Sequence, residues 1–226
     1  MTVRPANIRI DIVSDVVCPW CIIGFKQLER ALAQIEDEVK PEIHWHPFEL
    51  NPQMPPEGQD LREHMAQKYG TSIEQSRAAR GRLKQIAGSL GVEFRLDEGM
   101  RIYNTFKAHQ LLHWAGEQGE QTKLELALFE SYFSREEKVD DPEVLVAAAG
   151  RAGLDQDEAR SVLSDGRYAD AVRDQQRFWL SKGVHAVPSI ILDQRFLIPG
   201  AQEADVFAAA LRKAGDSATR APEQAR

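Results

Sequence analysis

Residues 8–24 read IRIDIVSDVVCPWCIIG, and this stretch decides the fold. Its first half alternates isoleucine with other residues, which is the period-two pattern of a β-strand. Apolar residues at helical spacing follow the second cysteine, and Pro19 suits the first position of a helix because its missing N–H would be unpaired there. We therefore expect a strand followed by a helix that has Cys18 as its N-cap.

The rest of the chain predicts a sheet that is interrupted by a long helical segment. A second strand is expected at 42–50, two more at 187–193 and 196–199, and a last helix at 203–214. The sequence pattern between the second and third strands is helical almost throughout. Neither end of the chain can bury both faces of its own strands, but together the ends can form one four-stranded sheet. We expect an α/β fold with an all-helical insertion, divided as follows: a discontinuous sheet domain at 1–58 and 183–214, the insertion at 59–182, and a flexible tail at 215–226.

Composition narrows the possible partners and location. The 226 residues carry 28 Lys and Arg against 35 Asp and Glu, for a formal net charge of −7. A negative surface repels phosphate backbones, which argues against nucleic acid and anionic membranes as partners. No apolar run approaches the ~20 residues of a membrane helix, and the first residues lack a signal-peptide pattern. We expect a cytoplasmic protein, either a monomer or a homodimer.

The two cysteines of the chain, Cys18 and Cys21, predict a redox centre. Residues three apart at the start of a helix share one face and can form a disulfide with little backbone movement. The unpaired N–H groups and the positive dipole of the first turn favour a thiolate at this position. We expect Cys18 to be the exposed nucleophile and Cys21 the buried thiol that resolves the mixed disulfide. Trp20, between them, is expected to offer an exposed contact to partners.

The alternative interpretation of the cysteine pair is half of a zinc site. Zinc needs four ligands, and a second CxxC motif is missing. His109 with His113, or His44 with His46, could complete the set, but the distance along the chain far exceeds that of a zinc finger. We favour redox chemistry without a metal or prosthetic group, and keep a non-enzymatic zinc module as a lesser alternative.

Two further positions are candidates for support of the site. Pro188 opens a strand pattern, where proline removes a donor from the sheet. It is either a simple first residue of the strand or a cis-proline that leaves Val187 free to pair with an extended substrate. Asp15 precedes the first cysteine by three residues and either relays a proton to Cys21 or caps a loop.

These residues resemble the DsbA-like branch of the thioredoxin superfamily, and in particular its FrnE-type members. The similar segments cover nearly the whole chain: SDVVCPWCIIG at 14–24, FELNPQMPPEG at 48–58, NTFKAHQLLHWA at 104–115, LFESYF at 128–133, GVHAVPSIILD at 183–193 and PGAQEADVF at 199–207. The resemblance implies a thioredoxin-like fold with a helical insertion, and thiol:disulfide exchange on protein or small-thiol substrates. It also implies that Cys18 is the nucleophile, that Cys21 resolves and that Pro188 is a cis-proline, with Pro19 and Trp20 as supporting residues.

The chain departs from this family pattern at two positions. Ile22 stands where an aromatic residue often follows the second cysteine, and Ala186 replaces a glycine that commonly precedes the Val-Pro pair. Neither residue carries a redox atom, so the expected effect of both changes is on the substrate groove.

The same branch contains the main rival function. The 2-hydroxychromene-2-carboxylate isomerases and the kappa-class glutathione transferases are similar in architecture, but generally use a serine near the Cys18 position. A serine site has no use for a resolving thiol, so the presence of Cys21 favours the oxidoreductase. By analogy with these relatives, glutathione is a possible co-substrate. We expect a glutathione or peptide site to be lined by Asn51, Val187, Ala201, Gln202 and His109.

Overall fold

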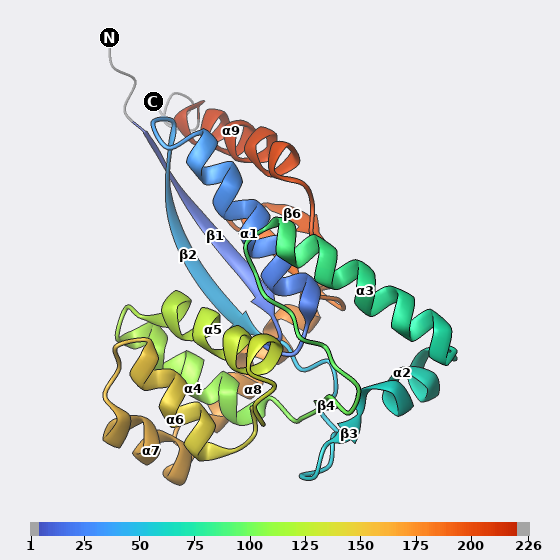
Figure 1. Cartoon of the computed structure of the whole chain (residues 1–226). Coiled ribbons are helices and arrows are strands. Elements are labelled where there is room, and N and C mark those ends of the chain that lie inside the picture. Colours follow the sequence, from blue (N-terminus) through green and yellow to red (C-terminus); the bar gives the residue numbers. More distant parts are fainter. Residues whose placement is uncertain (1–4, 221–226) are drawn as a thin grey trace.

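A four-stranded sheet forms the centre of the computed structural model, which describes residues 5–220 (Figure 1). The strands lie in the order β2-β1-β5-β6. β1 (Ala6–Ser14) pairs in parallel with β2 (Val39–Pro47) and antiparallel with β5 (Ser189–Leu192), which in turn pairs antiparallel with β6 (Phe196–Pro199). The two ends of the chain therefore share one sheet, as the strand patterns predict.

Helices cover both faces of this sheet. α1 (Pro19–Gln34) and α9 (Ala204–Arg220) pack beside each other over the face that carries the isoleucines of β1. On the other face, Val13 of β1 packs against Trp179 of α8 (Ala169–Ser181). Alternate residues of β1 thus serve two separate apolar layers, and this burial on both faces stabilises the strand.

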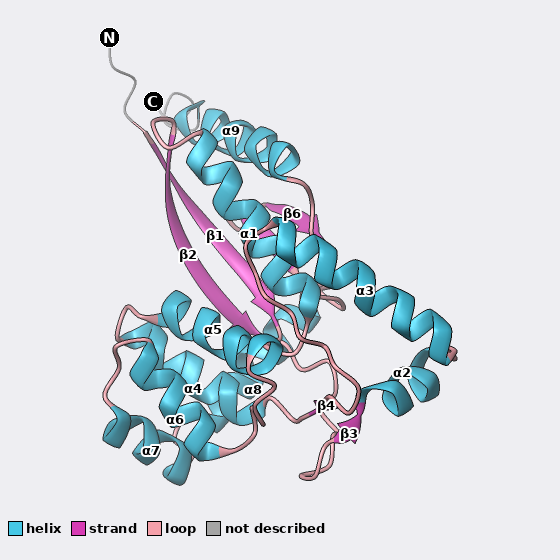
Figure 2. Ribbon diagram, viewed as in Figure 1, coloured by secondary structure: helices cyan, strands magenta, loops and turns pink. Residues whose placement is uncertain are grey.

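The segment between β2 and β5 is mainly helical (Figure 2). It contains, besides α8, the following elements: α2 (Leu61–Tyr69), α3 (Ile73–Ser89), α4 (Phe106–Glu117), α5 (Gln121–Phe129), the π-helical turn η1 (Glu130–Ser134), α6 (Pro142–Arg151) and α7 (Gln156–Asp165). Figure 1 shows α4 to α8 gathered at one end of the sheet, while α3 touches α1 near one end and extends away from it toward α2. The α/β fold with a helical insertion is therefore confirmed.

The insertion is not helical throughout, which corrects one detail of the expectation. β3 (Gln59–Asp60) pairs antiparallel with β4 (Arg101–Ile102). The guanidinium group of Arg101 also donates hydrogen bonds to the carbonyl groups of Glu57 and Gly58. A two-residue strand is too short to show a period-two pattern, so the alternation of apolar residues could not reveal it.

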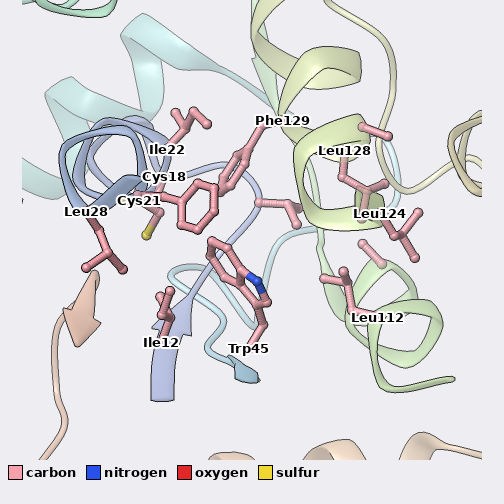
Figure 3. Packing of buried hydrophobic residues seen from close by; sticks show 14 of the residues in the cluster. Ile12, Cys18, Cys21, Ile22, Leu28, Trp45, Leu112, Leu124, Leu128 and Phe129 are labelled. Carbon is pink, nitrogen blue, oxygen red and sulfur yellow. The ribbon is translucent and has the colours of Figure 1, made fainter. Parts of the chain in front are cut away.

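Aromatic side chains join the sheet to the insertion. The ring of Trp45 on β2 lies 4.9 Å from that of Phe25 on α1 and 6.3 Å from that of Phe129 on α5. Figure 3 shows Trp45 and Phe129 between the cysteines of α1 and the leucines of α5. The buried residues of both regions form one continuous cluster, so the two regions share a core.

The C-terminal expectation needs a second correction. α9 continues to Arg220, so residues 215–220 of the predicted tail belong to this helix; the rest of the predicted tail, 221–226, lies outside the described residues, as do residues 1–4. Ala214 is buried, and a Cβ at Gly215 would stand 3.3 Å from Ala6. At Gly215, α9 thus packs against the start of β1. None of the helices in residues 5–220 has the length and apolar character to cross a bilayer.

Candidate active site

Cys18 and Cys21 lie at the start of α1. Cys18 is the N-cap in extended conformation, and its carbonyl accepts a hydrogen bond from the Cys21 N–H at 3.1 Å. Both cysteines are free thiols in the structure. Cys21 is completely buried, as expected, but Cys18 is only 4% exposed. The expectation of an exposed Cys18 is therefore wrong, and its side chain makes no capping hydrogen bond to the helix.

The segment before β5 covers Cys18. Sγ of Cys18 faces the Val187 carbonyl oxygen at 3.8 Å, and the peptide bond between Val187 and Pro188 is cis. A Cβ at Gly24 of α1 would stand 3.2 Å from Cγ of Pro188 and 3.3 Å from Cα of Ala201. The structure thus brings the first cysteine, the Val-Pro pair and Ala201 to one side of α1.

Other predicted site residues lie elsewhere around α1 or make contacts of their own. Trp20 is 43% exposed. The Asn51 side chain accepts a hydrogen bond from Lys68 at 2.8 Å, and the Gln202 side chain donates one to the Pro199 carbonyl at 2.7 Å. Within residues 5–220, neither of these two amides hydrogen-bonds to the CPWC segment.

Asp15, three residues before Cys18, forms a buried pair with His109. Asp15 Oδ2 accepts a hydrogen bond from the Leu50 N–H at 2.7 Å, while Oδ1 lies 3.6 Å from His109 Nε2, which donates to the Phe48 carbonyl at 2.9 Å. Burial disfavours the charged imidazole, but Asp15, with the charges of Glu125 and Glu49, outweighs it and raises the pKa of His109. His109 is 3% exposed, so it lies under the site and not on a surface that a substrate contacts.

Ser14 and Glu125 are two buried polar residues near the cysteines that the sequence did not single out. The Ser14 hydroxyl donates to Glu125 Oε1 at 2.8 Å, and both side chains are within 2% of complete burial. Burial raises the pKa of Glu125 to about 7, against the opposing effects of the His109 charge and the Ser14 hydrogen bond. One signal was available: Glu125 interrupts the apolar run LELALF at 124–129.

The resolving position carries a thiol that is hard to ionise. Burial raises the pKa of Cys21 well above its usual value, and the neighbouring Cys18 thiol adds to this effect. The Asp15 backbone and the Ser14 hydroxyl act in the opposite direction: they lower the pKa of Cys21 and favour its thiolate. Ser14 is therefore a polar link between the cysteine and Glu125.

The histidines that the zinc alternative requires have other partners. His44 contacts Glu42, His46 contacts Asp11 at 2.7 Å, and the His113 ring lies 5.0 Å from that of Tyr168. Across the described part of the chain, no three His, Cys, Asp or Glu side chains converge so that they could hold a metal ion.

The chain is similar to a known protein family and to several solved structures. Residues 9–212 match the family described as the DSBA-like thioredoxin domain. The probable DsbA oxidoreductase SCO1869 of Streptomyces coelicolor is 37% identical, with a TM-score of 0.86 over 92% of this chain and 89% of that one.

Two more distant structures share the fold. A 2-hydroxychromene-2-carboxylate isomerase is 14% identical, with a TM-score of 0.68 over 93% of this chain and 98% of that one. The cytosolic disulfide reductase DsbM of Pseudomonas aeruginosa, solved with GSH, is 17% identical, with a TM-score of 0.60 over 94% and 99% of the two chains. The match over residues 9–212 and the relative of known structure show that this chain belongs to the DSBA-like thioredoxin domain family.

Proposed function

We propose that this protein is a thiol:disulfide oxidoreductase that cycles Cys18 and Cys21 between dithiol and disulfide. One observation carries the proposal: the two thiols share the first turn of α1, and the Val187 carbonyl oxygen lies 3.8 Å from Sγ of Cys18. The dipole of α1 favours a thiolate at its first residue, and a strand-like substrate can pair with the backbone beside it.

The proposed reaction has two exchange steps. The Cys18 thiolate attacks a substrate disulfide, forms a mixed disulfide and expels one substrate thiolate. Cys21 then loses its proton and attacks Cys18 Sγ, which closes the internal disulfide and releases the second substrate thiolate. The reverse sequence transfers the disulfide to a substrate dithiol, so the same two sulfurs serve an oxidase or a reductase.

The comparisons support a proposal on the substrates and location. The DsbM structure carries GSH and its name describes a cytosolic reductase, so we propose glutathione or protein thiols as substrates, and the cytoplasm as the compartment. Val187 and Ala201 lie close to the Cys18 side of α1. They are the proposed contacts for a substrate backbone, and Asn51 and Gln202 remain predicted contacts farther out.

Replacement of each cysteine in turn tests the proposal. Cys18→Ser should abolish reduction of a disulfide substrate, whereas Cys21→Ser should accumulate a mixed disulfide at Cys18, measured by intact mass with and without reductant. Full reductase activity in Cys18→Ser would contradict the proposal. Glutathione-dependent turnover that survives the loss of Cys21 would instead indicate an isomerase or transferase, and unfolding on chelation would indicate a zinc module.

A further inference from the structure

Closure of the internal disulfide requires a proton to leave Cys21, whose side chain has no contact with solvent. We infer that this proton passes through the Ser14 hydroxyl to the carboxylate of Glu125 on α5, and that a water-sized cavity between the sheet and the insertion connects Glu125 with solvent. The inference rests on the proposed function and assigns a role in it to the helical insertion.

The contacts form a continuous path. Ser14 ends β1, and its hydroxyl lies close enough to Cys21 to lower the pKa of that thiol. The same hydroxyl lies 2.8 Å from Glu125 Oε1. A hydroxyl accepts one proton while it donates another, so Ser14 can pass a proton between sulfur and carboxylate without moving.

Asp15 is the obvious competing base, because its buried Oδ1 has no hydrogen-bond partner, but both of its carboxylate oxygens face groups other than Cys21. Oδ2 accepts from the Leu50 N–H at 2.7 Å, and Oδ1 faces His109 at 3.6 Å. The Asp15 contact to Cys21 comes from its backbone. The carboxylate of Asp15 therefore neutralises His109, while that of Glu125 is connected to the thiol through Ser14.

A small cavity leads away from Glu125. It has space for about one water, close to 10 Å³. Glu125 lines it with Ser14 and His109, and β2 contributes Trp45, His46 and Pro47. The half-buried His113, Gln121 and Gln175 border it as well. Its lining includes no residue of the CPWC segment and neither Val187 nor Pro188. A proton can thus leave between the sheet and the insertion while a substrate covers Cys18.

The charges around Glu125 suit transfer in both directions. Burial raises its pKa to about 7, the His109 charge and the Ser14 hydrogen bond lower it, and the Asp15 charge raises it again. Both forms are therefore populated near neutral pH. The ionised form takes the proton of Cys21 when the disulfide closes. The protonated form returns a proton to the Cys21 thiolate when a substrate thiolate opens the disulfide.

The test follows the reactions of Cys18 and Cys21 as two successive kinetic phases. The reduced protein reacts with excess 5,5′-dithiobis(2-nitrobenzoate) in a stopped-flow instrument: attack by Cys18 releases the first coloured thiolate, and closure by Cys21 releases the second. In the wild type, the second rate should rise with pH through an inflection near 7. In Glu125→Gln, that inflection should disappear and the second rate should fall on the order of 10²-fold above pH 7, while the first rate is unchanged.

Other variants locate the path. Ser14→Ala should slow the second phase and Ser14→Thr should restore it, because threonine keeps the hydroxyl. Glu130→Gln, an exposed site five residues along the chain from Glu125, should change neither phase. The inference is wrong if Glu125→Gln retains the wild-type second phase, or if Asp15→Asn alone removes the inflection.

Absence of a second phase in the wild type would overturn the proposed function and the inference together, whereas an unaffected Glu125→Gln overturns only the inference.

Discussion

At the scale of single residues, the ionised form of Glu125 lowers the free energy of unfolding, because burial disfavours its charge. It is completely buried, and its folded pKa of about 7 exceeds the ordinary value of 4.5. Below pH 4.5, Glu125 is protonated in both the folded and the unfolded chain. Between the two values only the folded chain holds the proton, so the free energy of unfolding falls as the pH rises toward 7. His109 acts in the same direction: its folded pKa is raised above 6.5, so its contribution to the free energy of unfolding is lost as the pH rises from 6.5 through the folded pKa.

Removal of this carboxyl group should therefore stabilise the protein at high pH. We expect Glu125→Gln to match the wild type near pH 4 and to exceed its free energy of unfolding at pH 8 by on the order of 3 kcal/mol, the equivalent of the difference between 4.5 and about 7. Urea titrations at both pH values measure this. An equal fall in stability from pH 4 to 8 in variant and wild type would show that Glu125 does not carry the dependence.

At the scale of elements, α1 is held close to the segment before β5 by a residue without a side chain. A Cβ at Gly24 would meet Pro188 and Ala201 at 3.2–3.3 Å, which is closer than ordinary van der Waals contact. Gly24 thus lets the helix that carries the cysteines approach the Val-Pro pair, and the relative position of Cys18 and Val187 depends on this approach.

A pair of alanine substitutions isolates this contact. Gly24 and Gly81 both lie inside helices, but a Cβ at Gly81 would meet nothing within 4 Å. Alanine is the better helix former by about 1 kcal/mol, so Gly81→Ala should stabilise the protein by about that amount. Gly24→Ala should lose this gain and slow the first exchange phase, because Pro188 must move. Thermal unfolding and stopped-flow measurements check both, and equal stabilisation by the two variants would contradict the interpretation.

At the scale of the whole molecule, the sequence predicted what local patterns encode. The alternating strand and Pro19 predicted β1 and the start of α1, and the apolar patterns placed the four strands of the sheet at both ends of the chain. The buried polar network was not predictable in this way, because Ser14 and Glu125 are 111 residues apart and only the packing of α5 against the sheet brings them together. The burial of Cys18 likewise depends on the distant Val187.

The shared core should make the sheet and the insertion unfold together, although the predicted boundary at 59–182 divides them. Phe129 of the insertion is 2% exposed and lies beside Trp45 of the sheet. We expect Phe129→Ala to lower the free energy of unfolding by about 3–5 kcal/mol, and Phe178→Ala, at a half-exposed phenylalanine, to cost much less. Hydrogen exchange should show amides of β1 and α6 losing protection together in Phe129→Ala, because truncation at the junction destabilises both. Protection that persists in β1 while α6 exchanges freely would mean that the insertion is a separate folding unit, in which case the path from Cys21 to Glu125 could open without unfolding of the sheet.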